Sequence, residues 1–330
     1  MIVTLTPNPS IDRTVEVDAI RRGAVSRATG GRVDSGGKGV NIAAALVAHE
    51  EPVIAVLPCG GPEGAQLAMM LDNEGIPTVR VRIAGSTRAN ISIVEPDGTV
   101  TKLNELGPHL DPAEVEALIQ ATSGSAKGAE WMVASGSLPL GVVDDFYAMV
   151  VQRLAGSDTR VAVDTSGPAL VKALTTTLDV VKPNLEELGE ATGIQIVTVG
   201  DALDAAQALR ERGAVTVIVS LGGDGALYVT DRDAVHAEAP VETPRSSVGA
   251  GDALLAGFLA NGGNDVGAFV AGVAWAAAAV GLPGTRMPGP NDVDVSIVRL
   301  HDRVDCARVV GQRTGATARE VVGSRERKGE

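Results

Sequence analysis

The sequence has few cysteines, fewer basic than acidic residues and no long apolar run, and each shortage argues against a class of protein. Its two cysteines, Cys59 and Cys306, lie far apart in no metal-like spacing, so neither a disulfide framework nor a zinc site is expected. No apolar run approaches the roughly 20 residues that cross a bilayer, and the first residues lack the basic stretch of a signal peptide. We therefore expect a cytoplasmic protein.

The excess of acidic residues gives the 330-residue chain a formal net charge of −13. Such a charge argues against nucleic acid or an anionic membrane as a partner. It also means that a phosphorylated ligand must be held by a few local cations. Hydrophobic residues make up 45% of the chain and charged residues 21%, which is enough apolar material for one large or two ordinary domains.

Short β-branched runs alternate with amphipathic or alanine-rich stretches along most of the chain. The runs predict buried strands and the stretches predict helices, a pattern typical of an α/β fold in which helices flank a parallel sheet. Strands are predicted at residues 2–6, 53–57, 131–134, 160–163, 178–181 and 215–220, and helices at residues 114–122, 144–154 and 201–212.

Residues 78–104 break this alternation, because strand-like runs follow one another there without a helix. The runs at 79–83, 89–94 and 100–103, with a Pro96-Asp97-Gly98 turn and a further strand at 13–17, predict a small separate sheet. We expect this sheet to form a lid over the α/β body. Exposed strand edges on such a lid favour the pairing of two lids in a homodimer.

The expected organisation is a single domain over residues 1–310. Its lid is expected at about residues 12–32 and 78–107. The last residues, 311–330, are polar and rich in Arg, so they predict a disordered tail, with a short helix as the alternative.

The segment Gly249-Ala250-Gly251-Asp252 places a carboxylate between a glycine turn and an apolar helical run. The first amides of a helix have no intrahelical partner, so they favour an anion in front of them. The negative charge of Asp252 alone makes phosphate binding there unfavourable. It fits if Asp252 takes a proton from an attacking hydroxyl while the amides hold a transferring phosphoryl group. The alternative is an Asp that caps an ordinary helix.

Two common nucleotide-binding motifs are missing. The segment Gly36-Gly37-Lys38-Gly39-Val40-Asn41 precedes a helical run, but it is not a Walker A motif, since Gly39 rather than Ser or Thr follows Lys38. No GxGxxG follows a strand and opens a helix, which argues against an NAD-dependent dehydrogenase. The glycines either let the backbone approach a ligand beside Lys38 and Asn41 or form a surface turn.

Polar residues also lie at the ends of the first strand and of the lid hairpin. Asp12 is placed to bond sugar hydroxyls or to cap a loop. Arg88 and Asn90 open the hairpin, and Lys102 and Glu105 close it, so two cations near one end could clamp a substrate phosphate. The alternative for each of these cations is a solvated surface side chain.

Two further segments follow predicted strands. In Lys182-Pro183-Asn184-Leu185-Glu186-Glu187, the amide of Asn184 and the carboxylate of Glu187 suit a water-coordinated Mg²⁺ near phosphates, and they also form a capping-box-like helix start. The glycines of Ser220-Leu221-Gly222-Gly223-Asp224-Gly225 offer either a flat surface for a nucleotide or a plain hairpin turn.

Taken in order, six motifs resemble the PfkB/ribokinase family of sugar kinases over roughly residues 1–300. They are residues 8–12, 36–41, 135–139, 182–188, 220–223 and 249–252. Residues 6–12, the run Gly37-Lys38-Gly39 and residues 101–108 are most similar to the kinases of fructose 1-phosphate, although Leu106 stands where many members have proline.

The resemblance implies a ribokinase-like α/β sandwich with a mostly parallel central sheet and a small β-sheet lid. It implies that ATP phosphorylates the C6 hydroxyl of fructose 1-phosphate, giving fructose 1,6-bisphosphate. Tagatose 6-phosphate and fructose 6-phosphate are the alternative substrates. A non-catalytic sensor of a sugar phosphate or nucleotide is the alternative from another class.

The resemblance also implies a role for each candidate residue. Asp252 is the expected base, and the amides of Gly249, Ala250, Gly251 and Asp252 form the expected anion hole. The sugar phosphate is expected at Asp12, Gly36, Gly37, Lys38, Asn41, Arg88, Asn90, Lys102, Glu105 and Ser137, and ATP at Lys182, Asn184, Ser220, Gly222, Gly223 and Gly225. Mg²⁺ is expected at Asn184 and Glu187 through water, and a monovalent cation such as K⁺ between residues 244–248 and 279–284.

Overall fold

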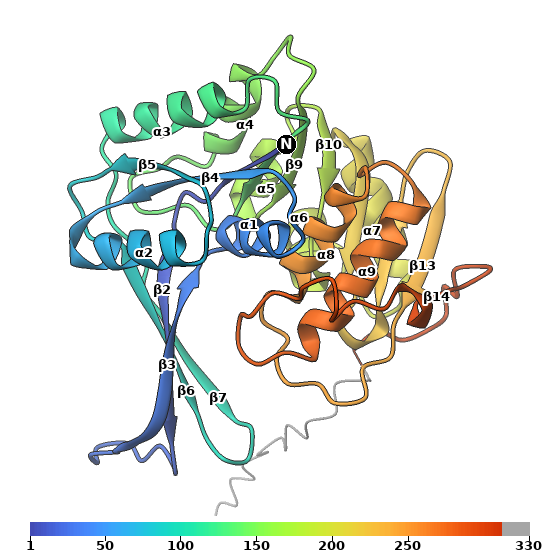
Figure 1. Ribbon diagram of the computed structural model, residues 1–330. Coiled ribbons are helices and arrows are strands. Elements are labelled where there is room, and N and C mark those ends of the chain that lie inside the picture. Colours follow the sequence, from blue (N-terminus) through green and yellow to red (C-terminus); the bar gives the residue numbers. More distant parts are fainter. Residues whose placement is uncertain (312–330) are drawn as a thin grey trace, which may run out of the picture.

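The computed structural model describes residues 1–311, so the tail expected at residues 311–330 lies almost wholly outside the described part. Figure 1 shows an α/β body from which a long, narrow second sheet projects. Within the described residues, no helix is both long and apolar enough to span a bilayer.

The sheet of the body has ten strands in the order β14-β13-β12-β11-β10-β9-β8-β1-β4-β5. The strands from β11 to β5 pair in parallel, as the sequence predicts, and β12, β13 and β14 add an antiparallel edge. The strands are β1 (Ile2–Leu5), β4 (Val53–Cys59), β5 (Thr78–Arg82), β8 (Trp131–Ser135), β9 (Arg160–Asp164), β10 (Leu178–Val181), β11 (Ala214–Ser220), β12 (Ala226–Val229), β13 (Ala234–Glu238) and β14 (Arg299–Leu300).

Helices cover both faces of this sheet. One face carries α1 (Lys38–Ala48), α2 (Gly61–Asn73), α8 (Ala250–Ala260) and α9 (Val266–Val280), and the other carries α3 (Pro112–Ser125), α4 (Phe146–Arg153), α5 (Gly167–Ala173), α6 (Leu185–Thr192) and α7 (Val199–Glu211). The helices predicted at 114–122, 144–154 and 201–212 correspond to α3, α4 and α7. Short 3₁₀ turns lie at Gly222–Asp224 and Val295–Ile297.

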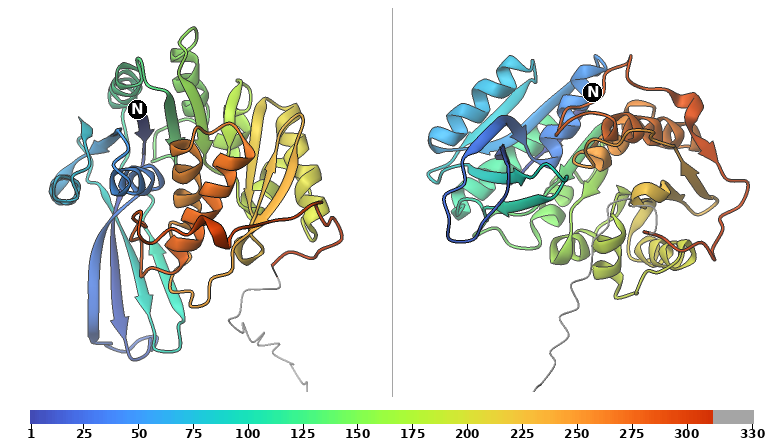
Figure 2. Two further views of the ribbon diagram at one scale, coloured as in Figure 1. Left: turned by 45° about the vertical axis from the view of Figure 1, so that its right-hand side comes forward. Right: turned by 90° about the horizontal axis from the view of Figure 1, so that it is seen from below.

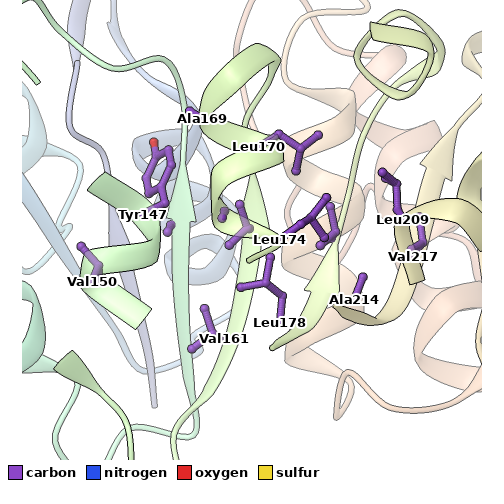
Figure 3. Close-up of a cluster of buried hydrophobic side chains, with 14 of the residues drawn as sticks. Tyr147, Val150, Val161, Ala169, Leu170, Leu174, Leu178, Leu209, Ala214 and Val217 are labelled. Atoms are coloured by element: carbon purple, nitrogen blue, oxygen red, sulfur yellow. The ribbon is translucent and has the colours of Figure 1, made fainter. Parts of the chain in front are cut away.

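Each face of the sheet has its own apolar core, because successive side chains of a strand point to opposite faces. In β11, Val217 and Val219 belong to one core and Ile218 belongs to the other. Figure 3 shows part of the first core, where Leu170 of α5 and Leu174, the residue after this helix, lie beside the central strands. The run of buried apolar residues in β11 is what a strand covered on both faces requires.

The second sheet, here called the lid sheet, has the strand order β3-β2-β6-β7. Its strands are β2 (Ser10–Val17), β3 (Ala28–Gly36), β6 (Arg88–Val94) and β7 (Val100–Asn104). The runs predicted at 13–17, 89–94 and 100–103 lie in it. The left view of Figure 2 shows how it stands away from the body.

One strand prediction is wrong, because residues 79–83 do not join the lid sheet. The strand β5 pairs in parallel with β4 at the edge of the large sheet. A parallel pair needs a crossover connection, and α2 provides it. The lid was expected to include the chain from residue 78 onward. Its first strand in this part of the chain begins only at Arg88.

The candidate residues meet at one edge of the large sheet. The parallel strands β1, β8, β9, β10 and β11 all end there, and chain segments leaving a parallel sheet at its carboxyl edge are where such folds bind ligands. The lid sheet starts from the same edge, since β2 follows β1 after a short connection and β3 leads into α1.

Candidate functional site

Asp252 lies in the first turn of α8, directly after a glycine turn. Gly249 precedes the helix with a φ of 81°, in the left-handed region that favours glycine, and an added Cβ there would lie 2.5 Å from Met287 Cε. The Asp252 residue is only 7% exposed, and its Oδ2 accepts a hydrogen bond of 2.7 Å from Asn41 Nδ2. Asn41 belongs to α1, so this bond joins the starts of two helices.

Backbone amides beside this carboxylate are available to a ligand. The amide of Ala250 donates to Ser247 O at 3.4 Å, whereas the amides of Gly251 and Asp252 have no acceptor among residues 1–311. An unpaired helix start attracts an anion. The Lys182 ammonium strengthens this attraction, since its Nζ lies 3.1 Å from where a Cβ on Gly251 would stand.

A buried carboxylate holds two lysines at this edge of the sheet. Asp164, at the end of β9, is fully buried, and its Oδ1 lies 2.7 Å from Lys38 Nζ while its Oδ2 lies 3.0 Å from Lys182 Nζ. Lys182 is 4% exposed and Lys38 is 32% exposed. Lys38 also pairs with Glu187 Oε1 at 3.0 Å.

The protonation states follow from these contacts. Burial raises the pKa of Asp252 to about 6, and the negative charge of Asp164 adds to the rise. Burial alone would also raise the pKa of Asp164, but Lys182 and Lys38 outweigh it and hold that pKa below its usual value. Burial opposes the charge of Lys38, yet Asp164 and Glu187 raise its pKa well above that of a free lysine. Asp164 is therefore a stable anion, whereas Asp252 can exchange a proton.

Asn184 and Glu187 form the capping box at the start of α6. Asn184 Oδ1 accepts from the amide of Glu187 at 2.8 Å, and Glu187 Oε2 accepts from the amide of Asn184 at 3.0 Å. The other oxygen of Glu187 accepts from Lys38. Since both oxygens already have partners, Glu187 fits a metal held through water better than a direct ligand. No group of three or more His, Cys, Asp or Glu within residues 1–311 is spaced to hold a metal ion.

A second polar cluster lies where the lid sheet meets the body. Asn90 Nδ2 donates to Asp12 Oδ1 at 2.9 Å and to Ser10 Oγ at 3.0 Å. A Cβ on Gly36 would lie 2.6 Å from Asp12 Oδ1, so only glycine lets β3 approach this carboxylate. Arg88 of β6 lies opposite Ser10 of β2, on the same face of the lid sheet as Asp12 and Asn90.

Arg88 is held at this cluster by the chain that leaves the lid sheet. Its guanidinium donates to Glu105 O at 2.9 Å, and Glu105 Oε2 accepts from the amide of Ala89 at 2.9 Å. Burial lowers the pKa of Arg88, while Asp12 and Glu105 favour its charge. The cation is thus fixed beside Asp12.

Asn8 joins this cluster to the loop after β8. Its Nδ2 donates to Leu106 O at 3.0 Å and to Ser137 Oγ at 3.2 Å. A side chain on Gly107 would overlap the Asn8 amide, so the lid exit needs glycine at that position. Ser137 is thereby placed near the other candidate residues.

The Ser220–Gly225 turn lies beside Asn184. The strands β11 and β12 are antiparallel, so the turn closes a hairpin, as one of the two sequence interpretations has it. Ser220 bridges to Asn184, and its amide donates to Pro183 O at 3.1 Å. Gly222 and Gly223 are exposed on this turn.

The structure brings most of the sequence-predicted residues into these clusters, with one exception. Lys102 is exposed and pairs across the strands with Ser92, four residues beyond Arg88 on β6. At about 3.3 Å per residue, this places it roughly 13 Å along the strand from Arg88, too far for the two to clamp one phosphate from the same end.

Two residues at the centre of the site have no functional assignment from the sequence. Asp164 is a lone carboxylate after a buried strand, and its position at a strand's carboxyl end is the signal that could have identified it. Asn8 lies within a recognised motif, but its contacts span 98 and 129 residues of chain, which no local pattern contains.

Known proteins resemble this chain over most of its length. Residues 6–292 match the pfkB family carbohydrate kinases. A 1-phosphofructokinase of Haloferax volcanii is 38% identical over 299 residues, which cover 89% of this chain and 95% of that protein. An ATP-dependent 6-phosphofructokinase isozyme 2 of Mycobacterium tuberculosis is 36% identical over 300 residues, covering 89% of this chain and 88% of that protein. The crystal structure of phosphofructokinase-2 from Escherichia coli in complex with potassium has a TM-score of 0.83 at 32% identity, covering 88% of this chain and 96% of that one.

Substituting Asp164→Asn should destabilise the folded chain strongly. The change keeps the shape but leaves Lys182 buried without its counter-charge, and breaking a buried pair in this way costs about 3–5 kcal/mol. Urea unfolding followed by circular dichroism measures the loss. The exposed Asp158→Asn is the matched control and should unfold like the wild type. Equal stability of the two variants would contradict the pairing.

Proposed function

The chain belongs to the pfkB family of carbohydrate kinases and is an ATP-dependent sugar-phosphate kinase with a ribokinase-like fold, and we propose that it phosphorylates the C6 hydroxyl of fructose 1-phosphate. The products are fructose 1,6-bisphosphate and ADP. The observation that carries the proposal is the buried Asp252 beside the unpaired amides of α8, with Lys182 next to them.

Asp252 is the proposed general base. Its pKa of about 6 leaves it mainly ionised at neutral pH but basic enough to take a proton. In the reaction, the Asp252 carboxylate takes the proton of the C6 hydroxyl while the C6 oxygen bonds to the γ-phosphorus. The bond from that phosphorus to the bridging oxygen of ADP breaks, and the proton on Asp252 is later released to solvent.

The proposed anion hole stabilises the phosphoryl group in transit. The amides of Gly251 and Asp252 have no acceptor among residues 1–311, those of Gly249 and Ala250 complete the turn, and the Lys182 ammonium adds a full positive charge beside them. These groups are held in place before ATP binds, so little reorganisation is needed as charge develops. Asn41 orients the base through its hydrogen bond to Oδ2.

The sugar phosphate is proposed to lie between the lid sheet and the edge of the body. Asp12 and Asn90, which already bond to one another, would bind sugar hydroxyls, with Gly36 and Gly37 allowing close approach. Arg88, fixed beside Asp12, is the proposed partner of the existing phosphate. Lys38, Glu105 and Ser137 complete this list, and Lys102 is the least favoured member because of its position along β7.

ATP is proposed to lie along Lys182, Asn184 and the turn that contains Ser220, Gly222, Gly223 and Gly225. Mg²⁺, which the kinase family implies, would be held through water by Asn184 and Glu187, and when bound it neutralises phosphate charge. A monovalent cation such as K⁺ is proposed beside the anion hole. The two segments expected to hold it are in contact, since the amides of Arg245 and Ser246 donate to Val280 O at 2.8 and 3.2 Å.

Fructose 6-phosphate is the second candidate substrate. The Mycobacterium tuberculosis relative named for that activity is nearly as similar as the Haloferax volcanii 1-phosphofructokinase, at 36% against 38% identity. Tagatose 6-phosphate remains the third candidate, since it offers the same phosphate and hydroxyl chemistry to Arg88 and Asp12.

The test is ADP release with ATP and Mg²⁺, compared for fructose 1-phosphate, fructose 6-phosphate and tagatose 6-phosphate at equal concentrations. We expect the highest kcat/KM with fructose 1-phosphate. A higher value for another sugar phosphate would overturn the proposed substrate and keep the kinase. Absence of sugar-dependent ADP release would favour a sensor that binds these ligands without reaction.

Removing the base should abolish most of the rate, whether by substitution or by protonation. Asp252→Asn should lower kcat by roughly 10²–10⁴, the usual contribution of a general base, with KM for ATP nearly unchanged. In the wild type the carboxylate must be ionised, so kcat/KM should be level above about pH 7 and fall about tenfold per pH unit below the pKa of about 6. An active Asn variant that keeps this pH profile would exclude Asp252 as the base.

A homodimer that pairs two lid sheets is also proposed. The row Val33, Arg13, Ile91 and Leu103 lies on the face opposite to Asp12, and the residues Val33 and Leu103 are 43% and 56% exposed. Apolar exposure on a thin sheet favours burial against a second copy. Phosphofructokinase-2 from Escherichia coli, which has a tetrameric inhibited form, gives an example of self-association in this family.

Leu103→Lys should therefore weaken the dimer, because a charge on this face opposes its burial. Sedimentation velocity across micromolar concentrations measures the monomer fraction. Met69→Lys, which changes an exposed residue of α2 in the body, is the matched control and should leave the dimer intact. A wild type that stays monomeric throughout this range would exclude the lid-sheet dimer.

A further inference from the structure

A C-terminal strap, residues 299–311, runs from the edge of the large sheet to the start of α7. It begins as β14, paired with β13, and ends against residues 197–200, where the amide of Val199 donates to Arg308 O at 2.8 Å and that of Val310 to Val197 O at 3.0 Å. The strap, red in Figures 1 and 2, passes along the outer side of the body. It lies beyond residues 6–292, the stretch that matches the kinase family.

The strap contacts the Ser220–Gly225 turn, which is proposed to line the nucleotide. Arg308 Nη2 lies 2.8 Å from Asp224 Oδ1 and 2.9 Å from Glu238 Oε2. The amide of Gly311 donates to Asp224 Oδ2 at 2.9 Å. His236 Nε2 lies 2.7 Å from the carbonyl oxygen of Asp224, and its ring stacks on His301 of the strap.

Asp224 is the buried charged residue of this turn. It is 2% exposed, and Leu221 of the same turn is buried too, whereas Gly222 and Gly223 are exposed. A buried carboxylate needs a counter-charge, and Arg308 supplies it. Gly222 and Gly225 both have positive φ values, of 62° and 90°, so the turn itself has little intrinsic preference to hold its shape.

We propose that Arg308 is a positioning residue for ATP. Through its ion pair with Asp224, Arg308 fixes the Ser220–Gly225 turn. This inference rests on the proposed function, in which the turn lines the nucleotide. Arg308 is not among the residues proposed to contact either substrate. Loss of the Arg308–Asp224 ion pair should therefore lower the affinity for the nucleotide. It should leave the sugar-phosphate cluster, which lies at the lid sheet, unaffected.

The test compares Arg308→Ala, Arg308→Lys and the exposed control Arg303→Ala in the full chain. The dissociation constant of a non-hydrolysable ATP analogue with Mg²⁺ is measured by calorimetry, and KM for ATP and for the sugar phosphate by steady-state kinetics. We expect Arg308→Ala to weaken nucleotide binding about fivefold or more, while KM for the sugar phosphate stays within about twofold. Arg308→Lys, which can bridge the same carboxylates, should recover most of the affinity.

Asp224→Asn keeps the inference testable if Arg308→Ala does not fold, because it breaks the same ion pair from the other side. It should weaken nucleotide binding similarly, and where both variants fold, the double variant should be no worse than either. Unchanged nucleotide affinity in either single variant, or an equal loss for both substrates, would overturn the positioning role. If the wild type binds the analogue but phosphorylates no sugar phosphate, the proposed function fails while the affinity comparison still decides this inference.

Discussion

The arrangement of the site depends on one buried carboxylate, Asp164, which pairs with two lysines from different parts of the chain. Removing an ion from water costs several kcal/mol even after relaxation, and a partner offsets that cost only at close range. Asp164 lies 2.7 Å from Lys38 and 3.0 Å from Lys182, and it forms the only ion pair of Lys182 within residues 1–311. This pair keeps the Lys182 ammonium beside the start of α8 instead of in solvent. Burial raises the pKa of Asp252, and the charge of Asp164 adds to the rise, so Asp164 acts on both Lys182 and Asp252.

The lid sheet is connected to this charge cluster by very short stretches of chain. The strand β3 ends at Gly36 and α1 begins at Lys38, so the residue packed against Asp12 and the residue paired with Asp164 are two positions apart. The start of α1, which carries both Lys38 and the Asn41 that bonds Asp252, therefore lies one residue away from the lid sheet. That residue is Gly37, whose φ of 120° lies in the region that favours glycine.

Local patterns predicted much of this fold, and the errors occur where pairing is non-local. The strands β1, β9 and β10 are apolar β-branched runs buried on both faces, which sequence alone reveals. The strand β5 has the alternation of a half-buried strand, as the lid strands do, and only its parallel partner β4 assigns it to the large sheet. Motif residues such as Asp252 and Asn41 were predictable as members of the candidate site because glycine turns mark helix starts. Asp164 was not, since a single Asp after a strand is common and its partner Lys38 is 126 residues away. Lys102 lies opposite Ser92, a register that the predicted Pro96-Asp97-Gly98 turn already implies, so its distance from Arg88 was predictable from the sequence.

The position of Asp252 distinguishes catalysis from simple binding on physical grounds. A carboxylate at a helix start stabilises the helix. Here, however, it lies beside the amides that would bind an incoming phosphate, and its negative charge weakens the binding of any anion there. Its burial adds a desolvation cost, which is visible as the raised pKa. An Asn at this position would keep the hydrogen bond to Asn41 and avoid both costs. A protein that only senses its ligands gains nothing from the carboxylate, whereas a kinase needs a group that can take a proton next to the phosphoryl site. The unfavourable charge is thus the strongest physical argument that the site carries out phosphoryl transfer.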